Sequence, residues 1–246
     1  MNVNGQVYGD IEKEINSDQN KFSDSLKDAF WKAYYFFVKR KFILNGIEYS
    51  CFYHSYNKTW RNERAIELPV ARRLISEYDP AKTLEVGNVL PHYFPVSHTV
   101  VDKYEKGKGI LNTDIADFNS GKKFDLIISI STLEHVGWDE KPREPEKTLK
   151  AVEHMKKFLS PAGKLFITIP LGYNTDLENL IRLNKIKFSE VYYMKRIRGE
   201  QKSFLSKSPS FNNFWIETSE EEAMKCHYNT PFPHANAILL GTIENK

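Results

Sequence analysis

Short apolar runs alternate with helical stripes along the larger part of the chain. The runs are Thr83–Val86, Thr99–Val101, Phe124–Ile130 and Leu165–Ile169. Near-continuous Val, Ile and Leu is typical of parallel strands covered on both faces. Between the last two runs, Pro145 followed by Leu149, Val152 and Met155 predicts a helix with proline at its entrance. The alternation predicts an α/β fold with a doubly wound, mostly parallel sheet.

The same alternation continues toward the end of the chain. We expect a helix near 175–183, a strand at 191–197, a helix opened by Thr218 or Ser219, and a final strand at 235–242. Glu220, Glu221 and Glu222 would lie in the first turn of that last helix, where acidic side chains are favoured by the helix dipole.

The beginning of the chain has a different pattern. Residues 1 to about 20 are polar, and the stripe of Leu26, Phe30, Ala33 and Phe37 predicts an amphipathic helix after them. Asn45-Gly46 between β-prone residues predicts a hairpin. We therefore divide the chain into an N-terminal tail with a helix and hairpin cap, residues 1–62, and a main domain, residues 63–246.

The main domain is expected to open with a helix over 62–78. Its apolar stripe includes Ile66, Val70 and Leu74, and Pro69 is expected to kink the helix or to mark its first turn.

Composition narrows the class of protein. The 246 residues are 41% hydrophobic and 27% charged, and 35 Lys and Arg against 32 Asp and Glu leave a net charge of +3 without basic blocks. This gives no footprint for nucleic acid. No apolar run approaches the roughly 18 residues of a membrane span, and the start of the chain lacks the pattern of a secretory signal. Cys51 and Cys226 match no metal or disulfide pattern, so we expect a cytoplasmic protein without a metal site.

Polar side chains follow the predicted strands at the edge where an open parallel sheet binds ligands. They are Glu85, Gly87 and Asn88 after the first run, Asp102 and Lys103 after the second, Asp114 and Ile115 after a third crossing, and Ser129, Ser131, Glu134 and His135 at the end of the fourth. Four acidic side chains and one histidine therefore converge on one edge of the sheet.

These segments resemble the class I S-adenosylmethionine-dependent methyltransferases. The motifs that carry the resemblance are "TLEVGN", "VVDKYE", "TDIADF", "FDLIISISTLEHVG" and "LSPAGKLFITIPLG", over residues 83 to 172, and the closing "PFPHANAILLGTI". The resemblance implies a Rossmann-like sheet of about seven strands whose last strand is antiparallel. The first, second and fourth motifs also resemble methyltransferase-like proteins of microbial surface-glycan pathways.

The resemblance implies a role for each residue in binding S-adenosylmethionine. Gly87 lets the backbone approach the methionine part, and Glu85 orients that loop and attracts the ammonium group. Asp102 accepts from the ribose hydroxyls. The remaining cofactor residues are Asp114 and Ile115 at the adenine, Ser129 and Ser131 beside the methionine part, and Asn88 and Lys103 next to the strand ends.

The implied reaction is methyl transfer to a hydroxyl of a sugar or another small polar metabolite. His135 is the candidate base and Glu134 orients it or the acceptor, although His135 could equally pack under the cofactor. Acceptor contacts are expected from "GWDEKPREP" and from Tyr173 and Asn174.

One departure keeps other functions open. Val89 and Pro91 stand where the family has two further glycines, and the helix between the first two strands is shortened or absent. A non-catalytic scaffold is therefore one alternative. A nicotinamide-dependent oxidoreductase is a weaker one, because the first strand lacks GxGxxG.

Overall fold

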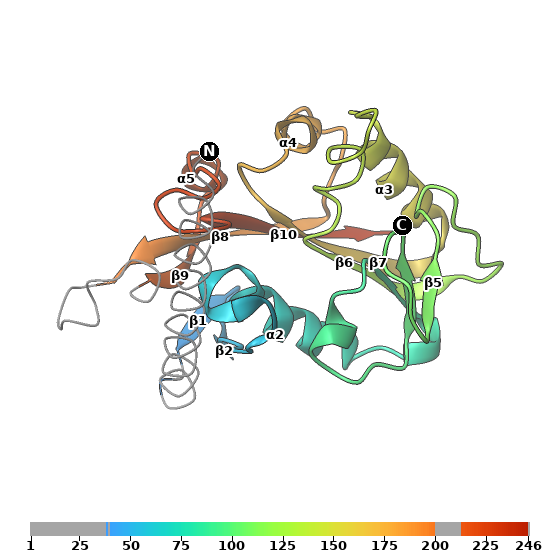
Figure 1. The fold of residues 1–246 in the computed structure, drawn as a ribbon, viewed down its shortest axis with the longest axis horizontal. Coiled ribbons are helices and arrows are strands. Elements are labelled where there is room, and N and C mark those ends of the chain that lie inside the picture. The colour runs from blue at the N-terminus through green and yellow to red at the C-terminus, as the bar shows by residue number, and fades with distance from the viewer. Residues whose placement is uncertain (1–37, 39, 200–212, 246) are drawn as a thin grey trace, which may run out of the picture.

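The computed structural model describes residues 38, 40–199 and 213–245. They form three layers, with a central sheet between two covering layers (Figure 1). The order of the eight strands is β5-β4-β3-β6-β7-β10-β8-β9. Their bounds are β3 Thr83–Val86, β4 Thr99–Asp102, β5 Ile110–Asn112, β6 Phe124–Ile130, β7 Leu159–Pro170, β8 Glu190–Arg198, β9 Asn213–Thr218 and β10 Ala237–Glu244. The predicted helix around Leu26 to Phe37 lies outside the described residues.

The sheet confirms the predicted fold class. Strands β3, β4, β5, β6 and β7 pair in parallel, and β10 lies antiparallel between β7 and β8. The architecture is therefore Rossmann-like with an antiparallel last strand. The edge strand β9, which pairs with β8, was not predicted. Its exposed Phe214 and Ile216 are as apolar as its buried Trp215, so the alternation that marks a half-buried strand is hidden.

One face of the sheet is covered by three helices, each of which the sequence predicted. They are α3 Lys147–Lys157, α4 Thr175–Arg182 and α5 Glu220–Ala223. Ser219 caps α5 by accepting from the backbone N–H of Glu222, and Asn174 caps α4 by accepting from that of Leu177. Val152 and Met155 of α3 join the same core cluster as Ile127 of β6.

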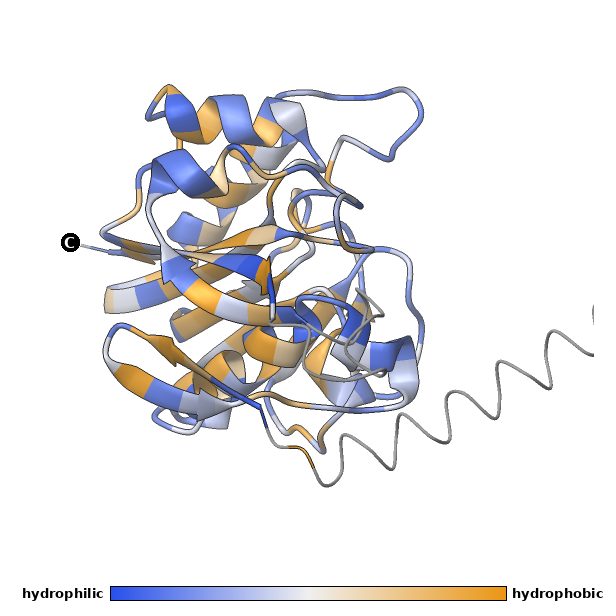
Figure 2. Ribbon diagram, turned by 90° about the vertical axis from the view of Figure 1, so that its left-hand side faces the viewer, coloured by the Kyte–Doolittle hydropathy of each residue, from blue (hydrophilic) through white to orange (hydrophobic). Residues whose placement is uncertain are grey.

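The opposite face is covered by the predicted hairpin and by α2 Arg64–Ile75. The hairpin consists of β1 Lys41–Leu44 and β2 Ile47–Ser50, joined by Asn45 and Gly46 at φ 50° and 71°. Phe42 and Leu44 enter a second core cluster with Ile128 of β6. Figure 2 shows the bands of hydrophobic residues along the strands between these layers. The division of the chain at residues 62 and 63 stays a prediction.

Pro69 lies inside α2 and does not mark its first turn, which excludes one of the two roles expected for this proline. It is the sixth residue of the helix and cannot donate to the carbonyl of Ala65, four residues earlier. That carbonyl accepts from the backbone N–H of Phe52 instead, at 2.8 Å. The proline thus leaves an acceptor that ties the segment after the hairpin to α2.

The connection between β3 and β4 contains no α-helix, in agreement with the expectation that this helix is shortened or absent. A single 3-10 turn, η3 Leu90–His92, takes its place. Two other 3-10 turns, η1 Tyr56–Arg61 and η2 Pro80–Lys82, precede the sheet.

The hairpin offers a matched test of how it is held. Leu44 is 6% exposed and its neighbour Ile43 is 57% exposed. We expect Leu44→Ala to lower the free energy of unfolding by about 2–5 kcal/mol, because a buried leucine leaves a cavity. Ile43→Ala should change it by less than about 0.5 kcal/mol. Urea unfolding of both variants measures this, and equal effects would contradict docking of the hairpin on the sheet.

Candidate functional site

A cavity of about 470 Å³ opens at the carboxyl ends of β3, β4 and β6. The predicted residues that line it are Gly87, Asn88, Asp102, Lys103, Asp114, Ile115, Ser131 and His135. Glu85, Ser129 and Glu134 do not line it and are almost fully buried. The structure therefore brings eight of the predicted residues to one hollow and leaves three inside the protein.

Glu85 organises the loop after β3. One carboxylate oxygen accepts from the backbone N–H groups of Val89 and Leu90, at 2.9 and 2.7 Å. The other oxygen lies 2.6 Å from Nε2 of the buried His98. The loop lacks the two further glycines and the helix of the family pattern. The Glu85 carboxylate fixes the course of its backbone through hydrogen bonds instead.

Gly87 has a local reason to be glycine. Its φ is +90°, and a Cβ there would lie 2.2 Å from Oγ1 of Thr132. The loop after β3 is therefore packed directly against the loop after β6. Thr132 also lines the cavity, and sequence reasoning missed it because only this contact distinguishes it.

Asp102 ties two loops together at the end of β4. Its Oδ1 accepts from the backbone N–H groups of Tyr104 and Glu105 at 2.8 and 2.7 Å, and its Oδ2 accepts from that of Asn88 at 3.0 Å. The side-chain amide nitrogen of Asn88, Nδ2, donates to Glu105 Oε2 at 2.6 Å. Glu105 lines the cavity and was not predicted. A carboxylate has about four acceptor positions, so Asp102 keeps room for one further donor.

Asp114 belongs to an ion network with two lysines. Its Oδ2 lies 3.0 Å from Nζ of Lys103 and 2.8 Å from Nζ of Lys147. Glu140 Oε2 lies 2.9 and 2.5 Å from the same two nitrogens. Burial acts to raise the pKa of Asp114, but hydrogen bonds from Lys147, the Ala116 amide and Lys103 lower it to about 2. The network joins the loops after β4, β5 and β6 to the start of α3.

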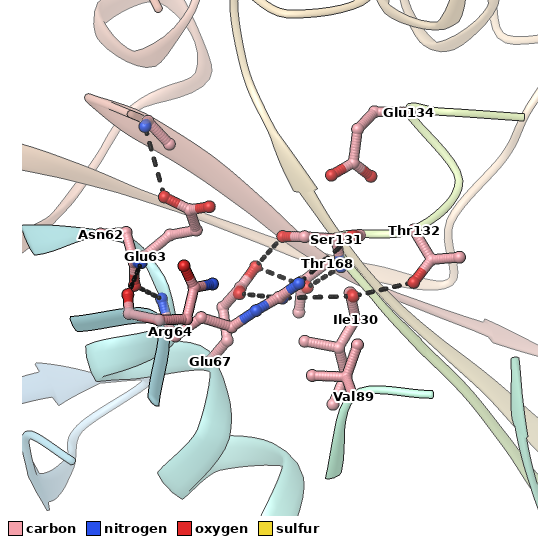
Figure 3. A network of polar contacts seen from close by, with 12 residues as sticks. Asn62, Glu63, Arg64, Glu67, Val89, Ile130, Ser131, Thr132, Glu134 and Thr168 are labelled. Carbon is pink, nitrogen blue, oxygen red and sulfur yellow. Dashed lines mark hydrogen bonds and ion pairs between the residues drawn. The ribbon is translucent and has the colours of Figure 1, made fainter. Parts of the chain in front are cut away.

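Ser131 faces the cavity with a strained backbone, at φ 36°. Its hydroxyl donates to Oε1 of Glu67 at 2.5 Å, and its N–H donates to Oγ1 of Thr168 at 3.0 Å (Figure 3). Thr168 in turn donates to the same Glu67 oxygen at 2.7 Å. The Ser131 hydroxyl is therefore committed to Glu67 of α2, and its carbonyl accepts from Arg64 of the same helix at 3.4 Å.

His135 is paired with Asp139. Nδ1 of the ring lies 2.5 Å from Oδ2 of Asp139, and the hydroxyl of Tyr173 donates to that oxygen at 2.8 Å. The rings of His135 and Tyr173 meet edge to face with centroids 5.0 Å apart. On its other side, Nε2 lies 3.6 Å from Oε1 of Glu134. The pattern Glu-His followed by Asp four residues later was the one signal that could have revealed this pair.

Glu134 is a buried acid with an unused oxygen. Within the described residues, its Oε2 has no hydrogen-bond partner. Burial raises the pKa of Glu134 well above its ordinary value, partly opposed by a backbone hydrogen bond and by Arg64. The carbonyl of Glu134 accepts from the side-chain amide of Asn174 at 2.8 Å. Within the same described residues, the buried hydroxyl of Ser129 also has no hydrogen-bond partner.

Neither a metal site nor a membrane-spanning helix is found in the described ranges. No group of three or more His, Cys, Asp or Glu is placed to hold a metal ion there. None of the helices in those ranges is long and apolar enough to cross a membrane.

No family model matches the chain, and no curated protein matches it. Several solved structures with a similar fold are methyltransferases. The N-methyltransferase NodS from Bradyrhizobium japonicum WM9, in complex with S-adenosyl-l-homocysteine, is 17% identical, with 74% of this chain and 87% of that chain covered and a TM-score of 0.42. The sugar N-methyltransferase KedS8 from Streptoalloteichus sp ATCC 53650 is 14% identical, with 81% and 97% covered and a TM-score of 0.35. An rRNA methylase from Streptococcus thermophilus is 10% identical, with 73% and 97% covered and a TM-score of 0.40. Scores of this size mark a distant likeness.

The buried Glu134 predicts a pH-dependent stability. At pH values below its ordinary pKa of 4.5 the carboxyl is protonated in both the folded and the unfolded chain. Above 4.5 the unfolded chain releases the proton while the folded chain keeps it, so the native protein loses stability as the pH rises toward the raised pKa.

Glu134→Gln removes this ionisation. We expect the variant to be more stable than the native protein at about pH 8 and to differ little from it at about pH 4. Glu153→Gln, at an exposed position of α3, serves as the control. Urea unfolding at the two pH values decides the matter, and a stability difference independent of pH would refute a buried neutral carboxyl.

Proposed function

We propose that the protein transfers a methyl group from S-adenosylmethionine to a hydroxyl of a sugar or a similar polar metabolite. The observation that carries the proposal is the cavity at the carboxyl edge of β3, β4 and β6, whose lining includes several carboxylates and the His135–Asp139 pair. This is the edge at which open parallel sheets bind nucleotide-like ligands.

The residues of the cavity fit such a cofactor. Val86, Val101, Ile115 and Val136 provide apolar walls for a flat ring. Asp102 has one acceptor position left for a ribose hydroxyl, and the Glu105 carboxylate beside it offers others. Asp114 would accept from the adenine amino group, with Ile115 against the ring. Asn88 Oδ1 is buried without a partner in the described part of the chain and would meet a donor of the ligand.

The cofactor supplies an activated methyl group on a sulfonium, so the protein is left with alignment and with the acceptor proton. We assign the proton to Nε2 of His135, because Nδ1 is held by Asp139. Glu134 does not line the cavity, and its Oε1 lies 3.6 Å from Nε2, so it would orient the imidazole from inside the protein. Gly87, Lys103 and Ser131 keep their proposed places around the cofactor. Ser129 is buried outside the cavity lining, and Glu85 acts by fixing the loop.

The acceptor would enter beside Asp139 and Tyr173, which lie next to His135. Polar side chains and aromatic rings together suit a sugar, and we place the reaction in glycan biosynthesis in the cytoplasm. No nucleic acid is expected as a partner, since the net charge is only +3.

One observation favours the second candidate, a non-catalytic scaffold. Asp102 and Asp114 already have partners within the protein, so both could serve only to hold the loops. A nicotinamide cofactor is the less favoured ligand. Calorimetric titration with S-adenosylhomocysteine, with NADH as comparison, distinguishes the three candidate functions. A methyltransferase binds the first ligand, a nicotinamide-dependent enzyme binds the second, and a scaffold of this kind binds neither.

The same titration tests Asp102. We expect Asp102→Ala to weaken binding of S-adenosylhomocysteine by about 1.5–3 kcal/mol, the range for a hydrogen bond to a charged acceptor. Asp117→Ala, an exposed carboxylate outside the cavity lining, should leave the affinity unchanged. Unchanged affinity in a folded Asp102→Ala variant would remove this residue from the binding site.

Catalysis is tested at His135. We expect His135→Ala to lower the methyl-transfer rate about 10²- to 10⁴-fold and to remove the imidazole ionisation from the pH profile, because the base is lost. Affinity for S-adenosylhomocysteine should change much less. Single-turnover transfer across about pH 5 to 9 measures this once an acceptor has been found by screening sugars. A rate and profile that survive the substitution would make His135 a packing residue.

A further inference from the structure

Asp139 lies where three segments meet at the side of the cavity. It accepts from His135 on its own turn and from Tyr173, which follows β7. The ring of Tyr173 packs against Tyr228, from the segment before β10, with centroids 5.1 Å apart. One carboxylate oxygen, Oδ2, therefore receives both the imidazole and the phenol.

The pairing decides which nitrogen of the imidazole carries the proton. A carboxylate can only accept, so the neutral ring must donate from Nδ1 and carry its lone pair on Nε2. Nε2 is the nitrogen on the side of Glu134, at 3.6 Å from its Oε1. A base that removes a proton from an acceptor needs a free lone pair, which this form of the ring carries on Nε2.

We propose that Asp139 is a positioning residue that holds His135 in the Nδ1–H form, with Tyr173 fixing the carboxylate oxygen that does so. This inference rests on the proposed function and names a residue that the sequence did not single out for that role. When Nε2 takes the acceptor proton, the charge of Asp139 also stabilises the imidazolium that forms.

The loop after β7 is built to keep Tyr173 in place. Gly172 has φ +82°, and a Cβ there would lie 2.7 Å from the backbone nitrogen of Tyr228. Asn174 caps α4 and donates to the carbonyl of Glu134. The loop is thus packed against the segment before β10 on one side of Tyr173, and on the other side it is hydrogen-bonded to the turn that carries His135.

The pair contributes little to folding, which makes the test clean. The side chains of His135 and Asp139 are 47% and 44% exposed, and exposed ion pairs stabilise proteins only weakly. The titratable groups that face the imidazole are Asp139, Glu134 and Tyr173. The half-exposed carboxylate of Asp139 therefore acts mainly on the imidazole of His135 and contributes little to the stability of the core.

The first measurement needs no substrate. Nitrogen-15 spectra of the histidine side chains, with His135 assigned from His135→Gln, report which ring nitrogen carries the proton. We expect the Nδ1–H form in the native protein and loss of that single form in Asp139→Ala. Asp176→Asn is the control, since this surface carboxylate pairs with Arg143 and does not line the cavity.

The second measurement is the rate of methyl transfer. We expect Asp139→Asn to lower kcat about 10²- to 10⁴-fold, the contribution of the base it positions, with KM and S-adenosylhomocysteine affinity within about twofold of the native values. Tyr173→Phe should lower kcat by about tenfold or less, because the bond between Asp139 and His135 remains.

The outcomes separate this inference from the proposed function. An unchanged His135 spectrum in Asp139→Ala, or a native kcat in Asp139→Asn, overturns the positioning role. A native protein that binds no S-adenosylhomocysteine overturns the proposed function instead, while the spectra still decide whether Asp139 sets the protonated nitrogen.

Discussion

The rest of the site depends on the ion pair and the hydrogen bonds of the buried Glu67 carboxylate. It lies inside the protein, between α2 and the carboxyl ends of β6 and β7, and it is paired with Arg64 at 2.7 Å. Burial raises the pKa of Glu67, and the charge of Arg64 opposes that shift. The hydroxyls of Ser131 and Thr168 donate to its other oxygen. Removing one partner of such a pair costs about 3–5 kcal/mol, because a buried charge is left alone.

The consequence reaches the cavity through the backbone. The guanidinium of Arg64 also donates to the carbonyl of Ile130 at 3.2 Å, so the last residue of β6 and the strained Ser131 are both held by α2 (Figure 3). From this fixed point the chain turns into Thr132, which packs on Gly87, and on to His135. Helix α2, which carries Arg64 and Glu67, thereby helps to fix the position of His135, the candidate base.

The layers could be predicted from the sequence, and most of the contacts in the site could not. The apolar runs Thr83–Val86 and Phe124–Ile130 coincide with β3 and β6, because strands covered on both faces leave a continuous signal. Gly87 and Asp102 could be placed at the strand ends by position alone. No periodicity shows that Glu67, a charged residue on a helix, is fully buried, since its partners come from β6 and β7. Burial of that kind is a property of the tertiary structure.

Hydrogen bonds and ion pairs within the protein order the loops that line the cavity. Asp102 takes its donors from the loops after β3 and β4, and the Lys103, Asp114, Glu140 and Lys147 network joins the next loops to α3. Loops already ordered by their own carboxylates lose little further entropy on binding, which favours affinity. The cost is that each carboxylate must share its remaining acceptor positions with the ligand. An altered glycine loop is compatible with binding on these terms, because Glu85 and Asp102 hold by hydrogen bonds what the missing glycines and helix would hold by shape.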